Sequence, residues 1–180
     1  MSLTKKTVKI EMDAQISEHI AFDEVIRSQT ATRLGLTNRP NFRQMTVIKN
    51  LVDKFFQPLR WELGVPIKVN SFYRSKRLNK MIGGSSRSDH MVRSNVAAID
   101  MDDTYSQKYG VYNRDIFLYI QRNMPYYKLI WEYDDKRTPN GKTSPKWVHV
   151  SFGMDPQQNE ERNTYYTNGN GYHEFVDEYL

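Results

Sequence analysis

Two histidines and two carboxylic acids occupy positions in this sequence from which they could form a metal site. Asp100, Glu132 and His149 each lie in a short segment in which apolar and polar residues alternate. Because side chains alternate between the two faces of a strand, these three would share the face opposite their apolar neighbours. Trp147 would lie on the same face as His149, facing a cleft, and is a candidate for substrate binding. His90 follows a serine-rich loop from which it could reach the same place.

Two imidazoles, one carboxylate and a water form the open, four-coordinate zinc site of hydrolytic enzymes. Such an ion acidifies bound water and polarises a carbonyl group. A second carboxylate that does not bind the ion could act as general base and then as acid, and Glu132 is the candidate. The same residues also fit purely structural roles: a strand histidine beside tryptophan is often buried and satisfied, and an aspartate after apolar residues often caps or turns the chain.

The elements that would position these residues are helices followed by a run of strands. Apolar residues recur at helical spacing over 41–59, where Asn41 is a plausible N-cap with Gln44 three residues on. Pro58 is expected to kink or end this helix, and Gly64 bounds it. The other expected elements are a partly helical segment at 17–34, a short helical turn at 78–82, a helix at 113–124, strands at 67–72, 97–102, 128–133 and 147–152, and a hairpin loop at 134–145. This order predicts an α+β fold: a single domain with a mostly antiparallel sheet and N-terminal helices packed on it.

The composition bounds the function. The chain has 180 residues, enough for one compact domain, and no cysteine, so disulfides and thiolate ligands are excluded. It carries 26 basic and 21 acidic residues, a net charge of +5 that favours anionic partners. No stretch is long and apolar enough to span a membrane, and the N-terminal lysines are not followed by a signal-peptide core. We therefore expect synthesis in the cytoplasm and, in solution, a monomer.

The sequence resembles the zinc D-alanyl-D-alanine carboxypeptidases and related phage peptidoglycan peptidases, whose fold is shared with the hedgehog signalling domain. The similarity runs in one order over about residues 17–155. The segments that carry it include Thr30-Ala31-Thr32-Arg33-Leu34-Gly35, Ser71-Phe72-Tyr73-Arg74-Ser75, Ile82-Gly83-Gly84-Ser85, Ser88-Asp89-His90, Ala98-Ile99-Asp100, Leu129-Ile130-Trp131-Glu132 and Trp147-Val148-His149-Val150-Ser151.

The resemblance implies a role for individual residues. His90, Asp100 and His149 are similar to the zinc ligands of the family, Arg74 to an arginine that meets substrate carboxylate or carbonyl groups, and Ser88 to a serine that contacts substrate. The implied cofactor is Zn²⁺, and the implied substrate is the stem peptide of bacterial peptidoglycan. Such an enzyme would act on the cell wall after release, as phage endolysins do, or on a virion.

Composition and the extent of the resemblance together divide the chain into three parts. These are a polar N-terminal segment at 1–16, a zinc peptidase domain at 17–155 and a peripheral C-terminal extension at 156–180. Of the two remaining histidines, His19 lies in the partly helical N-terminal segment and His173 in the polar C-terminal part, and both are expected to be solvated or capping residues.

The sequence departs from the family pattern at three places. The family usually spaces its first histidine and its aspartate seven residues apart, whereas His90 and Asp100 are ten apart. Either the loop between them bulges away from the ion, or Asp89 or Asp102 replaces Asp100. Lys146 and Trp147 stand where many relatives have an acidic residue or histidine, which moves the role of general base to Glu132. Asp89 stands where relatives often carry glutamine.

Two functions of other classes stay open at this point. A module with the same fold could bind a metal and the cell wall without hydrolysis, and the longer spacing and the missing acidic neighbour of His149 are its motivation. A nucleic-acid binder would rest on charge and on the 12 tyrosines, but no cluster of Lys or Arg supports it. We expect no nucleic-acid partner.

Overall fold

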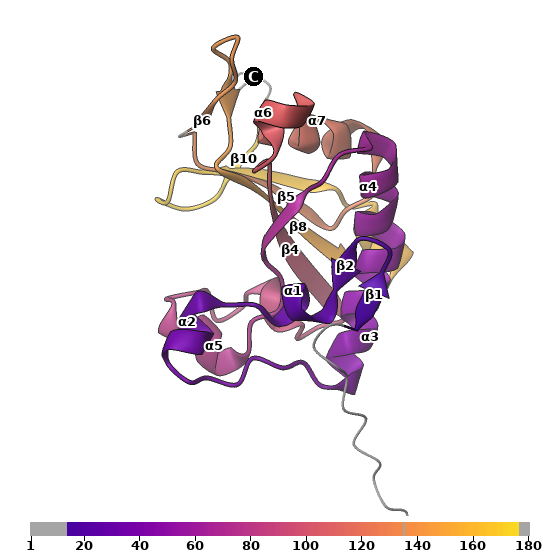
Figure 1. Ribbon diagram of the computed structural model, residues 1–180, viewed down its shortest axis with the longest axis vertical. Coiled ribbons are helices and arrows are strands. Elements are labelled where there is room, and N and C mark those ends of the chain that lie inside the picture. Colours follow the sequence, from indigo (N-terminus) through magenta and orange to yellow (C-terminus); the bar gives the residue numbers. More distant parts are fainter. Residues whose placement is uncertain (1–13, 135, 177–180) are drawn as a thin grey trace, which may run out of the picture.

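A mixed, mostly antiparallel sheet of six strands forms the centre of the computed structural model, which describes residues 14–134 and 136–176. Its strand order is β10-β9-β5-β8-β4-β3, and the β5–β9 pair is parallel, whereas the other neighbouring pairs are antiparallel (Figure 1). The strands are β3 (Lys68–Ser71), β4 (Val96–Asp102), β5 (Lys128–Glu132), β8 (Trp147–Gly153), β9 (Asn163–Thr167) and β10 (His173–Glu174). The predicted α+β class and mostly antiparallel sheet are confirmed.

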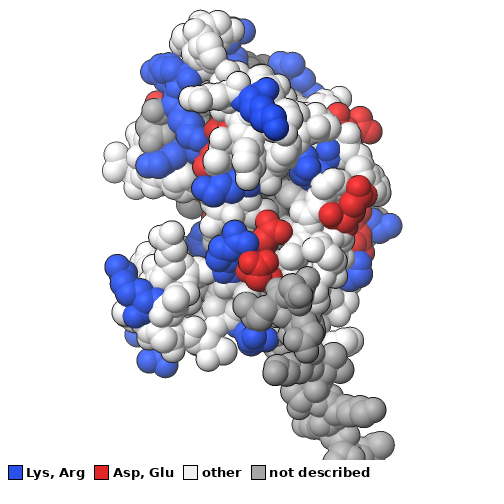
Figure 2. All heavy atoms as spheres, in the orientation of Figure 1, with Lys and Arg blue, Asp and Glu red and all other residues white. Residues whose placement is uncertain are grey.

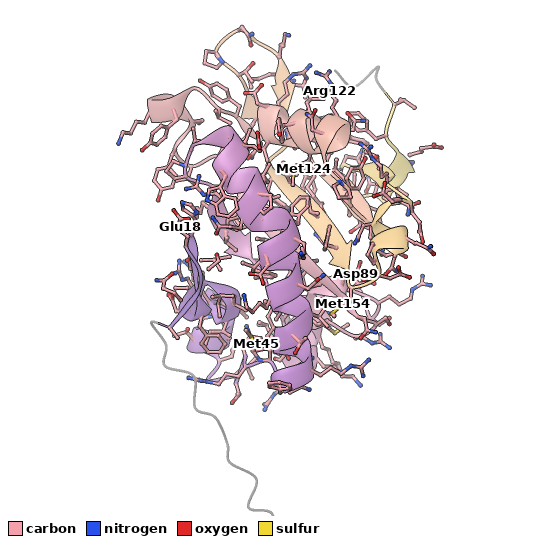
Figure 3. All side chains as sticks on the ribbon, turned by 90° about the vertical axis from the view of Figure 1, so that its right-hand side faces the viewer. Glu18, Met45, Asp89, Arg122, Met124 and Met154 are labelled. Carbon is pink, nitrogen blue, oxygen red and sulfur yellow. The ribbon has the colours of Figure 1, made fainter. Side chains whose placement is uncertain are left out.

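One long helical segment crosses a face of this sheet (Figure 3). It consists of α3 (Phe42–Leu51), the π-helical η1 (Val52–Phe56) and α4 (Gln57–Leu63). It begins at a capping box in which Asn41 and Gln44 each accept a hydrogen bond from the backbone N–H of the other, as the sequence predicts. It ends at Gly64, whose φ of 62° lies in the left-handed region.

Pro58 does not end this helix. It lacks an N–H, and its ring would clash with the carbonyl four residues earlier in a regular α-helix. The π-helical turn η1 comes directly before it, and the Gln57 N–H bonds to the carbonyl of Val52 instead of to that of Asp53. The wider turn lets the helix continue through the proline, which is a usual way to absorb such a clash.

Shorter elements complete the molecule. The N-terminal part contains β1 (Gln15–Ser17), β2 (Ile20–Ala21), α1 (Phe22–Ile26) and α2 (Gln29–Arg33), so the segment predicted as partly helical opens with a small hairpin. The remaining elements are α5 (Lys76–Met81), the 3₁₀ turn η2 (Asp89–Met91), α6 (Ser106–Tyr109), α7 (Asn113–Asn123), the β6 (Lys136–Arg137) and β7 (Thr143–Ser144) hairpin, and α8 (Pro156–Asn159). None of the helices in the described part of the chain has the length and apolar character needed to cross a bilayer.

The two faces of the sheet differ in character. On β8, Val148, Val150 and Phe152 belong to the hydrophobic core, together with residues of the long helix and α7. Trp147, His149 and Ser151 lie on the other face because strand neighbours alternate. One face therefore supplies stability, and the other is free to carry polar residues.

The C-terminal segment corrects one prediction. The sequence assigned residues 156–180 to a peripheral extension, but β9 pairs with β5 inside the central sheet. Phe175 is 8% exposed and its ring lies 4.8 Å from that of Phe117. Parts of this segment thus belong to the sheet and the core, whereas residues 177–180, like 1–13 of the predicted N-terminal segment, lie outside the described residues.

Candidate active site

The pairing of β4 with β8 brings the first two site residues together. Asp100 and His149 are direct partners across this antiparallel pair, and Asp100 Oδ1 lies 2.8 Å from His149 Nδ1. On the other side of β8, Ile130 of β5 is opposite His149 and Glu132 is opposite Trp147. The alternation seen in the sequence therefore does place the three acidic and imidazole groups on one face.

His90 reaches this face from the 3₁₀ turn η2. Its Nδ1 lies 2.6 Å from the carbonyl oxygen of Phe72, and since a carbonyl only accepts, Nδ1 carries the proton. The lone pair of the neutral ring is then on Nε2, which lies 3.2 Å from Asp100 Oδ2. His90 is fully buried, and this burial lowers the pKa of its imidazole, which favours the neutral form that can bind a metal.

The longer spacing between His90 and Asp100 is taken up by a bulge in the loop. Val92 and Asn95 have φ of 53° and 58°, so the chain reverses sharply before β4 begins. Two hydrogen bonds from other segments hold this loop. Asn95 Oδ1 accepts one from Arg43, and the backbone carbonyl of Asn95 accepts one from the N–H of Met154. Asp100 therefore stays beside His90.

The two alternatives for Asp100 have other partners. Asp102 accepts hydrogen bonds from Lys136, Asn70 and Asn113. Asp89 accepts from Lys128 and from the hydroxyl of Ser151. The other two histidines lie outside this centre, since His19 is 2.6 Å from Gln57 Nε2 and His173 is exposed on β10.

The three residues fit a zinc ion. One donor atom each from His90, Asp100 and His149 lies within 4.8 Å of the others, and no other group of this kind occurs within the described residues. Zinc bonds of about 2.0–2.2 Å in a tetrahedron hold their donors roughly 3 to 3.5 Å apart, so small movements would suffice. Burial acts to raise the pKa of Asp100, but His90 and His149 outweigh it, so the pKa lies below its ordinary value and the carboxylate is ionised.

Glu132 lies in the same cleft but outside this group of three. It is 8% exposed, and its burial raises the pKa of its carboxyl to about 7, while the nearby His149 opposes the shift and Asp100 adds to it. A carboxyl with a pKa near neutrality can both accept and donate a proton at neutral pH, as an acid–base catalyst must. The geometry thus suits the role expected from the sequence.

Arg74 closes the centre on the side of β3. Its Nη2 donates to Asp100 Oδ2 at 2.7 Å, and its Nε donates to Ser71 Oγ at 2.8 Å. These two bonds hold the guanidinium at the cleft wall with its remaining N–H groups available, since the group has five. Such a fork can bind a carboxylate or a developing oxyanion.

A cleft of about 990 Å³ contains all seven residues that the sequence singles out: Arg74, Ser88, His90, Asp100, Glu132, Trp147 and His149. The outline of the molecule is hollowed between the part that carries α2 and α5 and the part that carries β6, and Lys and Arg side chains are prominent on both rims (Figures 1 and 2). The cleft therefore presents positive charge at its rim and a buried acidic and imidazole centre.

The sequence did not point to several other residues of this cleft. Tyr165 and Tyr172 come from the C-terminal segment, and Lys128 from β5. The Tyr165 and Tyr172 rings lie 6.5 Å apart in an edge-to-face arrangement. Thr and Tyr favour strands, so the Asn163–Thr167 segment offered a signal for β9. That signal does not say which strand it joins.

This fold and this site define the chain as a metallopeptidase of the peptidase M15 class. A sequence model of the peptidase M15 family matches residues 18–115, more than half of the chain, and the chain belongs to this family. The match contains Arg74, His90 and Asp100 and ends before Glu132 and His149, which the structure brings to the same place. M15 peptidases depend on zinc. No curated protein matches the sequence closely.

Proposed function

We propose that this protein is a zinc peptidase that hydrolyses the stem peptides of bacterial peptidoglycan. The observation that carries the proposal is the meeting of His90, Asp100 and His149 with Glu132 in one cleft. The family alone supports a peptidase, and this cleft supports the chemistry. Delivery to the cell wall, after release from a cell or on a virion, is part of the proposal.

His90, Asp100 and His149 would hold the zinc through imidazole nitrogens and a carboxylate oxygen. When bound, zinc supplies Lewis acidity, which polarises a carbonyl and acidifies a water. This ligand set carries one negative charge, so the centre with its ion stays positive. It would therefore attract the carbonyl oxygen and carboxylates of a substrate.

Glu132 and Arg74 would perform the other steps. Glu132 takes a proton from the attacking water and returns it to the nitrogen of the leaving amine, which a carboxyl with a pKa of about 7 can do in both directions. Arg74, held at its Nε by Ser71, donates to the oxyanion that forms at the attacked carbonyl or to a carboxylate of the substrate.

The cleft walls support a substrate with free carboxylates and small side chains. Arg74, Arg87 and Lys128 supply cationic groups to a lining that also contains Asp89, Asp100 and Glu132. A substrate carboxylate could bind to these cationic groups. Ser88 offers a hydroxyl beside the centre, and Trp147 packs against Tyr133 to form an apolar wall, with ring centroids 5.2 Å apart. Stem peptides combine such carboxylates with alanine methyl groups.

The test combines zinc content with hydrolysis of stem peptides. We expect the wild type to bind one equivalent of zinc and to cleave, and His149→Ala to lose both. His19→Ala is the matched control, because His19 lies outside the cleft and pairs with Gln57. Full hydrolysis by metal-stripped His149→Ala would refute the proposal.

The products identify the bond, because a carboxypeptidase releases free D-alanine and an endopeptidase divides the peptide internally. A wild type that binds zinc and wall fragments without turnover would instead establish a binding module. Neither feature that motivated a module requires one, since His90 and Asp100 lie side by side despite the longer loop and Glu132 lies in the cleft. Salt-sensitive binding of generic DNA would point to the nucleic-acid reading.

A further inference from the structure

A series of hydrogen bonds leads from His149 away from the centre, toward the first residue of β5. His149 Nε2 lies 3.1 Å from Ser151 Oγ, and Ser151 Oγ donates to Asp89 Oδ2 at 2.8 Å. Lys128 Nζ donates to the same carboxylate oxygen, also at 2.8 Å. Four residues from β8, η2 and β5 are thus linked, across sequence separations of up to 62 residues.

The ion pair of Lys128 with Asp89, at the end farthest from the centre, fixes the direction of each hydrogen bond in this series. The Asp89 carboxylate is paired with the Lys128 ammonium group and accepts only. The Ser151 hydroxyl has a single proton and gives it to Asp89, so toward His149 its oxygen can only accept. His149 Nε2 must therefore be the protonated nitrogen, and in the neutral ring the lone pair lies on Nδ1.

That lone pair is directed at the candidate metal centre, because Nδ1 is the nitrogen that faces Asp100. A lone pair and a carboxylate oxygen 2.8 Å apart repel each other unless a proton or a cation lies between them. His90 has the same arrangement by another route, since the Phe72 carbonyl holds its Nδ1 proton. A backbone carbonyl fixes the tautomer of His90, and a series of side-chain hydrogen bonds fixes that of His149.

We infer that Ser151, Asp89 and Lys128 are positioning residues, which fix the tautomer and orientation of His149 so that Nδ1 can bind the ion. This inference rests on the proposed function, because it gives the chain a task at the proposed zinc centre. It assigns Asp89, which stands where relatives often carry glutamine, to His149 and not to substrate. It also explains why a charged pair lies at a half-buried site, with side chains 30% and 19% exposed for Lys128 and Asp89.

Of the three positioning residues, Ser151 is the one whose loss should affect the His149 tautomer most. Ser151 is fully buried, so its loss leaves the Nε2–H of His149 without a partner in the protein. The ring then gains by placing its proton on Nδ1, where Asp100 can accept it, and this tautomer cannot bind zinc through Nδ1. Partners of this kind typically affect metal affinity about 10–100-fold.

The experiment measures zinc affinity by competition with a chelator, and the histidine tautomers by ¹⁵N NMR of the zinc-free protein with its imidazoles neutral. We expect Ser151→Ala and Asp89→Ala each to weaken zinc binding about 10–100-fold. The His149 signals should move from the Nε2–H form toward the Nδ1–H form. Lys128→Met should produce the same change to a smaller degree.

Tyr126→Phe is the matched control, because it also removes one hydroxyl hydrogen bond of a buried side chain, to Thr164, but outside the cleft. It should leave zinc affinity and tautomers unchanged. If Ser151→Ala does not fold, Asp89→Ala and Lys128→Met, at partly exposed positions, carry the test.

Unchanged zinc affinity together with an unchanged His149 tautomer in these variants would overturn the inference. Failure of the proposed function looks different, since the wild type itself would then not bind zinc. The tautomer measurement would still decide the inference in that case, because it needs no metal.

Discussion

Asp100 is the residue on which the candidate centre converges. Its Oδ1 faces His149 Nδ1 and its Oδ2 faces both His90 Nε2 and Arg74 Nη2. A buried carboxylate is costly unless its charge is compensated, and here the Arg74 guanidinium donates to Oδ2 while both imidazoles lie beside the carboxylate. This crowding places the ligands close together and, through Arg74, ties the centre to the wall of the cleft.

Glu132→Gln tests the acid–base role at the scale of one residue. The amide keeps the size of the side chain but cannot take the proton from water, so kcat should fall about 10²–10⁴-fold. Zinc content and KM should change little, because Glu132 is not among the candidate ligands. Steady-state kinetics and metal analysis of the variant provide the measurement, and a kcat within a factor of three of the wild type would contradict the role.

At the scale of elements, the C-terminal strands serve both the core and the cleft. β9 is the parallel neighbour of β5, which carries Glu132, and it brings Tyr165 to the cleft. β10 follows, and after it Phe175 packs on Phe117 and Trp131. One short segment therefore covers core rings and lines part of the cleft.

Phe175→Ala and Tyr172→Ala separate these two tasks. Truncation of the buried Phe175 should lower the free energy of unfolding by about 3–5 kcal/mol, through lost contacts and a cavity. Tyr172 is 63% exposed, so its truncation should change stability by no more than about 0.5 kcal/mol while reducing kcat/KM for stem peptides.

Urea unfolding and peptide hydrolysis measure the two effects. If Phe175→Ala were as stable as the wild type, the C-terminal segment would not be part of the core. If Tyr172→Ala kept full kcat/KM, this tyrosine would not contact the substrate.

At the scale of the whole molecule, the sheet has the hydrophobic core on one face and the cleft with the candidate site on the other. The long helix and α7 cover one face with apolar side chains, and the cleft lies on the other. The candidate ligands come from η2, β4 and β8, which are distant in sequence. An ion held by all three would link them in the folded state and in no unfolded one.

Zinc should therefore stabilise the whole fold. At free zinc 100 times its Kd, the gain is about 2.7 kcal/mol. For a chain of this size it corresponds to a rise in Tm of about 5–10 °C. Thermal unfolding with zinc and with a chelator measures it, and His149→Ala should show no rise with zinc. An equal rise in that variant would place the ion elsewhere.

Much of the site was accessible from the sequence because it depends on local periodicity. The alternation of strands put Asp100, Glu132 and His149 opposite their apolar neighbours, and the Asn41 box marked the start of the long helix. Arg74 and Ser88 came from resemblance, and both line the cleft. The sequence did not predict that the helix continues through Pro58, because that depends on the π-helical turn before it. It also did not predict that β9, within residues 156–176, pairs with β5, because no local pattern specifies a partner strand.

The sequence by itself determined which residues could do chemistry and which face of each strand they occupy, because backbone stereochemistry fixes these within a few residues. Only the tertiary structure decided that the loop at 92–95 bulges and keeps Asp100 beside His90, and that Ser151, Asp89 and Lys128 line up behind His149. These features depend on contacts between distant segments. Such contacts form when the strands pair and the core packs, and no local pattern encodes them.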